Sequence, residues 1–456
     1  MNFKRFSWLL STFIIFGVCS VFAQRNNLDG SWEGKLMISP EMGLRLVINI
    51  NGSEGGDVTV TMDSPDQGAY GIPMQVDYIS KDSLNVSVSQ LMLKYQGKLE
   101  NDSIKGDFTQ GPLNLPLSLK PKDTALNRPQ SPQAPFPYLT EEVIFQSSLD
   151  NANLYGTLSL PNNKEITETP AVLLASGSGT QNRDEEIFEH KPFAVISDYL
   201  ARNGIASLRY DDRGFDKSTG LSPNPTTYEN AMDALGGVKY LKDRGFSKVG
   251  IIGHSEGGLI ADKVANHGNL IDFIVEIGGP SLPGDSILIF QNEFLLKDGG
   301  LPDEYISMYI DAMKGMFESQ KENNPVSFEE SKYEIFSPDN LTNPVLEPLA
   351  KNLKDNFTEL HPWLKYFINY DPLPDLKSIK VPVLMLYGEN DTQVPPSLNV
   401  PVLIENVPDI NVKVYPKLNH LMQHSVTGKV TEYGEIEETI SPEVLEDIKE
   451  FILSIN

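Results

Sequence analysis

Residues 249–258 read VGIIGHSEGG, an apolar run that ends in a turn of small residues. The run predicts a buried strand, and the residues after the turn predict a helix over Gly258–Asn266. A serine between two glycines on such a strand–turn–helix bend is held in a strained conformation that exposes its hydroxyl above the sheet. Ser255 is therefore the candidate nucleophile.

The chain around this bend alternates apolar strands with amphipathic helices, which predicts an α/β fold with a mostly parallel sheet covered on both faces. Between Pro283 and Asn369 the strand rhythm gives way to helical segments that contain methionine and phenylalanine, so a helical cap is expected over about residues 283–370. Strands are expected at Ala171–Ala175, Ile205–Tyr210, Val249–Gly253, Phe273–Ile277, Val383–Tyr387 and Val412–Tyr415, and helices near Pro192–Arg202, Tyr228–Arg244 and Pro442–Ile455.

A serine hydroxyl is a poor nucleophile at neutral pH unless a base takes its proton and an acid orients that base. Behind a bend of this kind the chain order is serine, acid, histidine. Of the six histidines, only His420 and His424 follow the candidate acid. His420 lies in the loop just after the strand that ends at Tyr415, so it is the predicted base, and His424 is the alternative.

The acid is sought at the end of the apolar run over residues 381–388, which leads into a loop containing Glu389 and Asp391. Asp391 lies in the loop at the carboxyl end of the expected strand, where it can meet the base. Glu389 follows the closing glycine of the strand directly, and we expect it to cap the strand or to face solvent. Asp391 is therefore the predicted acid.

A tetrahedral intermediate needs two preset N–H donors for its oxyanion, one from the residue after the nucleophile and one from a loop after an earlier strand. Glu256 and Ser178 are the predicted donors. The glycine-rich loop around Ser178 lacks the lysine of a P-loop and the third glycine of a dinucleotide fingerprint, so it does not indicate phosphate binding. Gln181 and His190 are expected to border the pocket, and Arg213 to brace the loop after its strand.

Four stretches together resemble the α/β-hydrolase superfamily over residues 138–456, and within it the serine-aminopeptidase-like and esterase-D-like group. They are residues 176–185 (SGSGTQNRDE), residues 210–214 (YDDRG), the bend at Ser255, and the pair formed by residues 388–391 and 419–420. Ser176 stands where many members of the group have histidine. The resemblance implies an acyl hydrolase that works through a covalent acyl-enzyme and needs no cofactor. No metal site is expected, because the histidines are dispersed.

The first 23 residues have a basic start, an apolar run over Trp8–Val18 and a small-residue ending, which predict a secretory signal peptide. The apolar run is shorter than the ~20 residues that span a membrane, so no membrane span is expected in the mature chain. The sequence thus predicts a periplasmic or secreted protein. Cys19, the only cysteine, leaves with the signal, so the mature chain can form no intramolecular disulfide.

Residues 24–122 alternate apolar and polar positions in short runs punctuated by Gly, Asn and Asp, as in antiparallel strands joined by tight turns. They predict a small all-β domain, a sandwich or partial barrel, and residues 30–36 (GSWEGKL) resemble the first strand of lipocalin-like domains. A proline-rich linker is expected at 123–137. The net charge of −25 disfavours nucleic acid and anionic membranes as partners.

These observations favour a serine esterase that cleaves small, neutral carboxylic esters, with the cap restricting the size of the substrate. A serine aminopeptidase acting on short peptides is the alternative. It needs an anchor for the substrate ammonium, for which Glu185, Glu186 and the acidic residues of the cap are candidates. A catalytically inactive hydrolase scaffold that serves as a binding protein through its β domain is the third reading. The sequence leaves the oligomeric state open.

Overall fold

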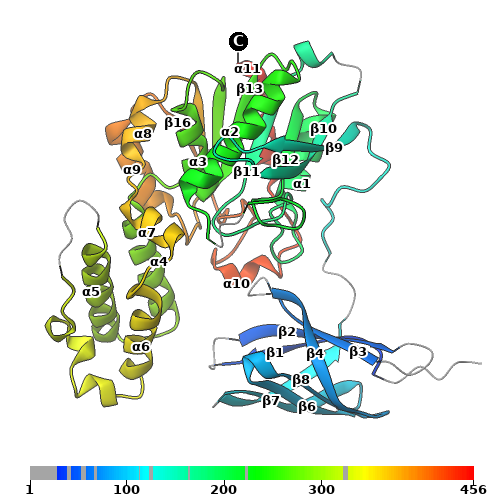
Figure 1. Cartoon of the computed structure of the whole chain (residues 1–456), viewed down its shortest axis with the longest axis vertical. Coiled ribbons are helices and arrows are strands. Elements are labelled where there is room, and N and C mark those ends of the chain that lie inside the picture. The colour runs from blue at the N-terminus through cyan, green and yellow to red at the C-terminus, as the bar shows by residue number, and fades with distance from the viewer. Residues whose placement is uncertain are drawn as a thin grey trace, which may run out of the picture. The chain divides into compact units, whose positions relative to one another are not determined.

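The computed structural model describes residues 28–38, 43–52, 58–65, 69–111, 113–122, 127–162, 165–220, 224–321 and 327–455. The chain divides into two units, Met1–Asp123 and Thr124–Asn456 (Figure 1). The expected signal peptide lies outside the described residues, as do the first residues of the expected linker. In the described part, no helix is both long and apolar enough to cross a membrane.

The first unit is a closed antiparallel barrel, where the sequence left a sandwich or a partial barrel open. Apolar side chains at alternate strand positions fill its interior. The first strand pairs with both its successor and the last strand, and Gly34 permits the closure, because a Cβ there would lie 2.3 Å from the carbonyl oxygen of Ser118. The strands are β1 Gly30–Met37, β2 Gly43–Gly52, β3 Val58–Ser64, β4 Ala69–Ile79, β5 Ser83–Val88, β6 Leu93–Glu100, β7 Ser103–Gln110 and β8 Leu113–Pro121.

The second unit is built on a sheet in the order β16-β15-β14-β13-β11-β12-β10-β9. The six strands β11 to β16 run parallel to their neighbours among themselves. In contrast, β10 is antiparallel to both β12 and β9. The strands are β9 Leu139–Gln146, β10 Asn153–Leu160, β11 Ala171–Ala175, β12 Ala206–Tyr210, β13 Val249–His254, β14 Phe273–Ile277, β15 Val383–Gly388 and β16 Asn411–Tyr415.

Helices cover both faces of this sheet. Ile251 of β13 packs with α2 (Thr227–Asp243) and α3 (Glu256–Ala265). Its neighbour Ile252 packs on the other face with α1 (Pro192–Arg202) and α11 (Pro442–Ser454). Burial on both faces explains why the central strands read as continuous apolar runs. The fold class predicted from the sequence is confirmed.

The segment expected to form a cap is helical and has an apolar core of its own, which includes Met313, Phe317 and Leu353. In Figure 1 its helices form a group outside the sheet. They are α4 Gly284–Asp298, α5 Asp303–Ser319, α6 Leu346–Phe357 and α7 Pro362–Asn369, and the chain then returns to the sheet through α8 Leu373–Ser378, with α9 Pro396–Asn406 and α10 Val430–Tyr433 farther on.

Candidate active site

Ser255 lies on the bend between β13 and α3 with φ 54° and ψ −120°, a backbone conformation that costs free energy for any residue but glycine. The two flanking glycines make the bend possible. A Cβ on Gly253 would lie 2.1 Å from the carbonyl oxygen of Gly257, and a Cβ on Gly257 would lie 2.1 Å from that of Ala175. The strain at Ser255 is therefore built into the packing of β11, β13 and α3.

Asp391 and His420 form a buried pair at the carboxyl-terminal edge of the sheet. The Nδ1 atom of His420 lies 2.6 Å from Oδ2 of Asp391. The other oxygen of Asp391 accepts hydrogen bonds of 2.8 Å from the backbone N–H groups of Gln393 and Val394. These bonds hold the carboxylate, and the carboxylate in turn holds the imidazole in one orientation.

The bend and the pair are neighbours. The N–H of Ser255 donates to the carbonyl oxygen of Ile277, and a Cβ on the next residue, Gly278, would lie 3.0 Å from the ring of His420. The structure thus brings Ser255, Asp391 and His420 to one edge of the sheet. Among the hydrogen bonds of the described residues, none joins the hydroxyl of Ser255 to His420.

The two alternative residues lie elsewhere. The side chain of His424 is 57% exposed and bonds to Glu438 at 2.8 Å. Glu389 is exposed, and its carboxylate accepts from the N–H of Lys417 at 3.2 Å. Among the hydrogen bonds and ion pairs of the described residues, none joins either side chain to Asp391 or His420.

The loop after β11 runs beside the nucleophile, because a Cβ on Gly177 would lie 3.2 Å from Cβ of Ser255. Asp212, at the end of β12, fixes this loop: its carboxylate accepts from the hydroxyl of Ser176 at 3.1 Å and from the N–H of Gln181 at 2.8 Å. Burial raises the pKa of Asp212 to about 8, although these hydrogen bonds oppose the rise. Ser176 therefore has a defined partner in this loop.

The two expected oxyanion donors come from the segments that flank Ser255. Glu256 is the first residue of α3, so its N–H has no acceptor within the helix. Ser178 belongs to the loop that Gly177 places against the nucleophile. Gln181 lies in the same loop, where its side-chain amide donates to the carbonyl oxygen of Ser178 at 3.2 Å.

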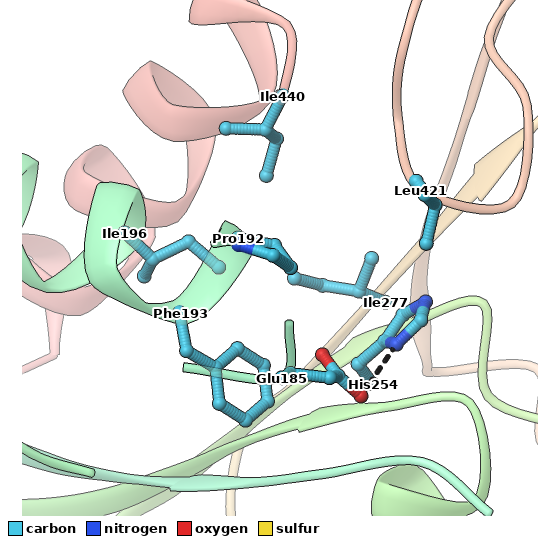
Figure 2. A pocket seen from close by; sticks show the side chains of 8 residues that line it. All are labelled: Glu185, Pro192, Phe193, Ile196, His254, Ile277, Leu421 and Ile440. Carbon is cyan, nitrogen blue, oxygen red and sulfur yellow. Dashed lines mark hydrogen bonds and ion pairs between the residues drawn. The ribbon is translucent and has the colours of Figure 1, made fainter. Parts of the chain in front are cut away.

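A second buried pair, which the sequence analysis missed, lies next to His420. The Nδ1 atom of His254 lies 2.9 Å from Oε1 of Glu185, and its Nε2 lies 3.1 Å from the carbonyl oxygen of His420 (Figure 2). The centroids of the His254 and His420 imidazole rings are 4.8 Å apart. The same oxygen of Glu185 accepts from the N–H of Gly177 at 2.7 Å. The pair thus links the loop after β11, residues 176–181, to the backbone of the predicted base. We call this segment the oxyanion loop after the donor expected in it.

Burial disfavours the charged form of His254, but the neighbouring Glu185 carboxylate outweighs it, so the pKa of His254 is raised. A protonated His254 can donate to both Glu185 and the carbonyl of His420. The other walls around the pair are apolar, as Figure 2 shows for Phe193 and Ile277. The signal that could have indicated this pair was a histidine directly before the nucleophile together with the acidic end of the loop at residues 184–186.

The structure does not bring His190 to a cleft. Its side chain is fully buried, with Nδ1 2.9 Å from the hydroxyl of Thr439 and Nε2 2.9 Å from the carbonyl oxygen of Tyr433. Burial lowers the pKa of His190 to about 4. Arg213 is also buried and makes a bidentate contact with Asp233 at 2.6 and 2.8 Å. Both residues tie separate segments together.

A cavity of about 290 Å³ lies between the oxyanion loop and the cap. Ser178 and Gly179 line one side, and Trp363 of α7 and His361 line another. A volume near the lower end of the range for ligand pockets suits a small molecule. In the part of the chain that the structure describes, no group of three or more His, Cys, Asp or Glu side chains could hold a metal ion.

Residues 172–430, more than half of the chain, match the model of the alpha/beta hydrolase family. Esterase EstD of Thermotoga maritima is 29% identical over 317 residues, which cover 67% of this chain and 68% of that protein. A non-heme haloperoxidase of Rhodococcus erythropolis is 27% identical, over 49% of this chain and 78% of that protein. Among solved structures, an esterase of Pyrococcus furiosus is 18% identical with a TM-score of 0.40, and the match covers 69% of this chain and 92% of that one.

Proposed function

The chain belongs to the alpha/beta hydrolase family, and on that premise we propose that it is a serine esterase that cleaves small, neutral carboxylic esters. The observation that carries the proposal is the contact of 2.6 Å between Asp391 and His420, beside a serine held at φ 54°. A buried acid–histidine pair next to a strained serine is the arrangement that activates a hydroxyl for attack. The esterase relative supports the same reaction class.

In the proposed mechanism the oxygen of Ser255 bonds to the ester carbonyl carbon while its proton passes to Nε2 of His420. Asp391 stabilises the imidazolium that forms. The N–H groups of Glu256 and Ser178 stabilise the oxyanion. The bond to the alcohol then breaks, and the alcohol leaves with the proton from His420. Water attacks the acyl-enzyme, His420 takes its proton, and the carboxylic acid departs as Ser255 regains its hydrogen.

The contacts of Glu185 and Glu186, the two candidate ammonium anchors beside the nucleophile loop, favour an ester over a peptide. Glu185 is buried and already bonded to His254 and to the N–H of Gly177. The side chain of Glu186 is 32% exposed and lies 3.5 Å from the ammonium of Lys191. A substrate ammonium would have to displace one of these partners. An inactive binding scaffold is disfavoured, because a buried carboxylate with three hydrogen-bond partners at a strained serine has no use in such a protein.

The experiment that tests the proposal compares p-nitrophenyl acyl esters of increasing chain length with aminoacyl-p-nitroanilides. We expect turnover of the short esters. Ser255→Ala should lower kcat by ~10³-fold or more, since the triad acts as a unit. A fluorophosphonate probe followed by peptide mapping should label Ser255 in the wild type and nothing in the variant.

Three results would contradict the proposal. Preference for the anilides would favour the aminopeptidase. A label on another serine would remove Ser255 from the mechanism. The absence of both turnover and labelling in a folded protein would leave the inactive scaffold as the better reading.

A further inference from the structure

The side chain of Glu256, next to the nucleophile, is only 2% exposed, yet it is an acid. Its Oε1 accepts from the hydroxyl of Thr227 at 2.7 Å. The indole N–H of Trp363 lies 2.9 Å from Oε1 and 2.8 Å from Oε2. Burial raises the pKa of Glu256, and hydrogen bonding from Thr227, Ser178 and Trp363 opposes the rise. A buried acid with so many donors is held in one place.

These donors come from three separate segments. Thr227 begins α2, Trp363 belongs to cap helix α7, and Ser178 belongs to the oxyanion loop. The backbone of Glu256 is itself the first turn of the helix behind the nucleophile. One carboxylate therefore joins the cap and both segments that are expected to supply the oxyanion donors.

Trp363 also forms a wall of the cavity of about 290 Å³ beside the oxyanion loop. Its ring stacks with that of His361, with centroids 5.8 Å apart, and with that of Phe367, with centroids 5.0 Å apart. The backbone of Gly179 and the ring of Pro225 face the same cavity. None of the described residues that line the cavity is Asp, Glu, Lys or Arg, and Trp363 and His361 give it a partly aromatic surface.

We propose that the Glu256 side chain is a positioning group that fixes cap helix α7 and Ser178 at the nucleophile, and that Trp363, held by it, limits the size of the uncharged ester group that enters the cavity. The second half of this inference rests on the proposed esterase function. The group is the acyl or the alkoxy part of the ester, and two substrate series separate these cases. Glu256 acts through its neighbours and touches no reacting atom with its side chain.

The kinetic test is a double-mutant cycle with Glu256→Gln and Trp363→Phe. The first replaces one carboxylate oxygen by an NH₂ group at constant size, and the second removes the indole N–H but keeps a smaller aromatic ring. It uses p-nitrophenyl esters that differ in acyl length and acetate esters that differ in alcohol length. We expect each single variant to lower kcat/KM about tenfold, the usual effect of losing a hydrogen bond to a charged group. The double variant should lose no more than either single one, and the preference for short chains should relax in one of the two series.

The matched control is Tyr309→Phe, which removes a hydrogen bond of 2.8 Å to Asn352 inside the cap and leaves the contact between Glu256 and Trp363 intact. Its effect should be small and should add to that of Trp363→Phe. Additive effects of Glu256→Gln and Trp363→Phe, or an unchanged chain-length preference in both series, would overturn the proposal.

A second measurement does not depend on turnover. In a Trp8→Phe/Trp32→Phe background Trp363 is the only tryptophan, and acrylamide quenching of its fluorescence reports its exposure. Glu256→Gln should increase the quenching. Unchanged quenching would overturn the positioning role whether or not esters are cleaved. Increased quenching in a protein that cleaves no ester would refute the proposed function and support the positioning role.

Discussion

The interiors of the two units differ in what they bury. Among the residues that the structure describes, the barrel buries one polar side chain, Ser64, and the polar atoms of its large aromatics bond to the backbone, as the hydroxyl of Tyr95 does to the carbonyl of Ile104. The second unit buries a set of ionisable residues that includes Glu185, Asp212, His254, Glu256, Asp262, Glu276, Asp391 and His420. Burying a charge is costly unless it is paired and hydrogen-bonded. The difference indicates that packing suffices for the barrel, and it supports our proposal that the chemistry lies in the second unit.

Within the second unit the buried acids fall into two kinds. Asp391 has a hydrogen-bond partner on each oxygen. Asp262 of α3 and Glu276 of β14 have no partner beyond each other among the described residues. Burial raises the pKa of both, and their mutual contact raises that of Asp262 further and lowers that of Glu276. The carboxylate of Glu276 lies against Gly258 and Gly279, behind the nucleophile bend, where a Cβ on either glycine would clash with it. These two kinds of acid should respond to substitution in opposite ways.

The largest effect is expected at the buried histidine. His420→Ala should lower kcat by ~10³-fold or more, because it removes the base, whereas His424→Ala removes an exposed side chain and should leave kcat nearly unchanged. Steady-state kinetics on one short ester measures both, with Tyr95→Phe in the barrel as the control. Equal losses in the two histidine variants would mean that the wrong base was assigned. A comparable loss of kcat in Tyr95→Phe would mean that the barrel contributes to catalysis and that the two units do not differ in this respect.

A smaller effect is expected from Glu185→Gln, which keeps the shape of the side chain but removes its charge. A neutral His254 carries one N–H, so it can no longer donate to both residue 185 and the carbonyl of His420. We expect kcat to fall about tenfold, the usual factor for one lost hydrogen bond to a charged group, with less change in KM.

Thermal unfolding of Glu185→Gln across pH adds a second measurement. The raised pKa of His254 means that its pairing stabilises the folded state below about pH 6.5 and that this stabilisation is lost as the pH rises through the raised value. Relative to wild type, the variant should therefore lose most stability below about pH 6.5, and the difference should shrink as the pH rises above that value. A loss that is constant with pH would show that His254 is neutral in the folded protein.

Glu276→Gln should have the opposite effect on stability. Because the folded-state pKa is raised, the folded protein holds a proton that the unfolded chain releases above about 4.5, so wild-type stability falls as the pH rises, by up to about 1.4 kcal/mol per pH unit. The glutamine variant should match wild type near pH 4.5 and be more stable at pH 8. Unfolding temperatures of the two proteins at both pH values measure this. A variant that is less stable than wild type at pH 8 would mean that a hydrogen bond from protonated Asp262 holds the ionised Glu276 and outweighs its burial.

Much of the fold could be predicted because its signals are local. The strands at Ala171–Ala175 and Phe273–Ile277 have the bounds expected from their apolar runs. The edge strand β9 and its neighbour β10 were not predicted, since polar residues interrupt them and they lack the continuous apolar pattern of the central strands. The closure of the barrel depends on pairing between its first and last strands, and no local pattern reports that pairing.

For the site, chain order and loop position predicted Ser255, Asp391 and His420 as candidates. The hydrogen-bond partners of buried polar groups could not be predicted from the sequence. Trp363 and Glu256 lie 107 positions apart in the chain. His190 has its partners more than 230 positions away, so the sequence could not show that its side chain is enclosed. Buried hydrogen bonds of this kind depend on the whole tertiary structure.

The smallest effect is expected from removing the barrel. The described part of the expected linker is fastened to the second unit: the guanidinium of Arg128 donates to the carbonyl oxygens of Phe188, Gly434 and Ile436, and Gln130 bonds to the backbone of Ile440. Deleting residues 24–122 keeps these bonds, so the remainder should stay folded and its kcat on a short ester should change little. Deleting residues 24–137 removes them, and the unfolding temperature should fall by several more degrees, at roughly 2–4 °C for each kcal/mol in a domain of this size. Calorimetry and ester kinetics on the two truncated proteins measure the difference. If the shorter deletion already abolishes turnover while circular dichroism shows a folded protein, the barrel takes part in the chemistry and the division between the units is wrong.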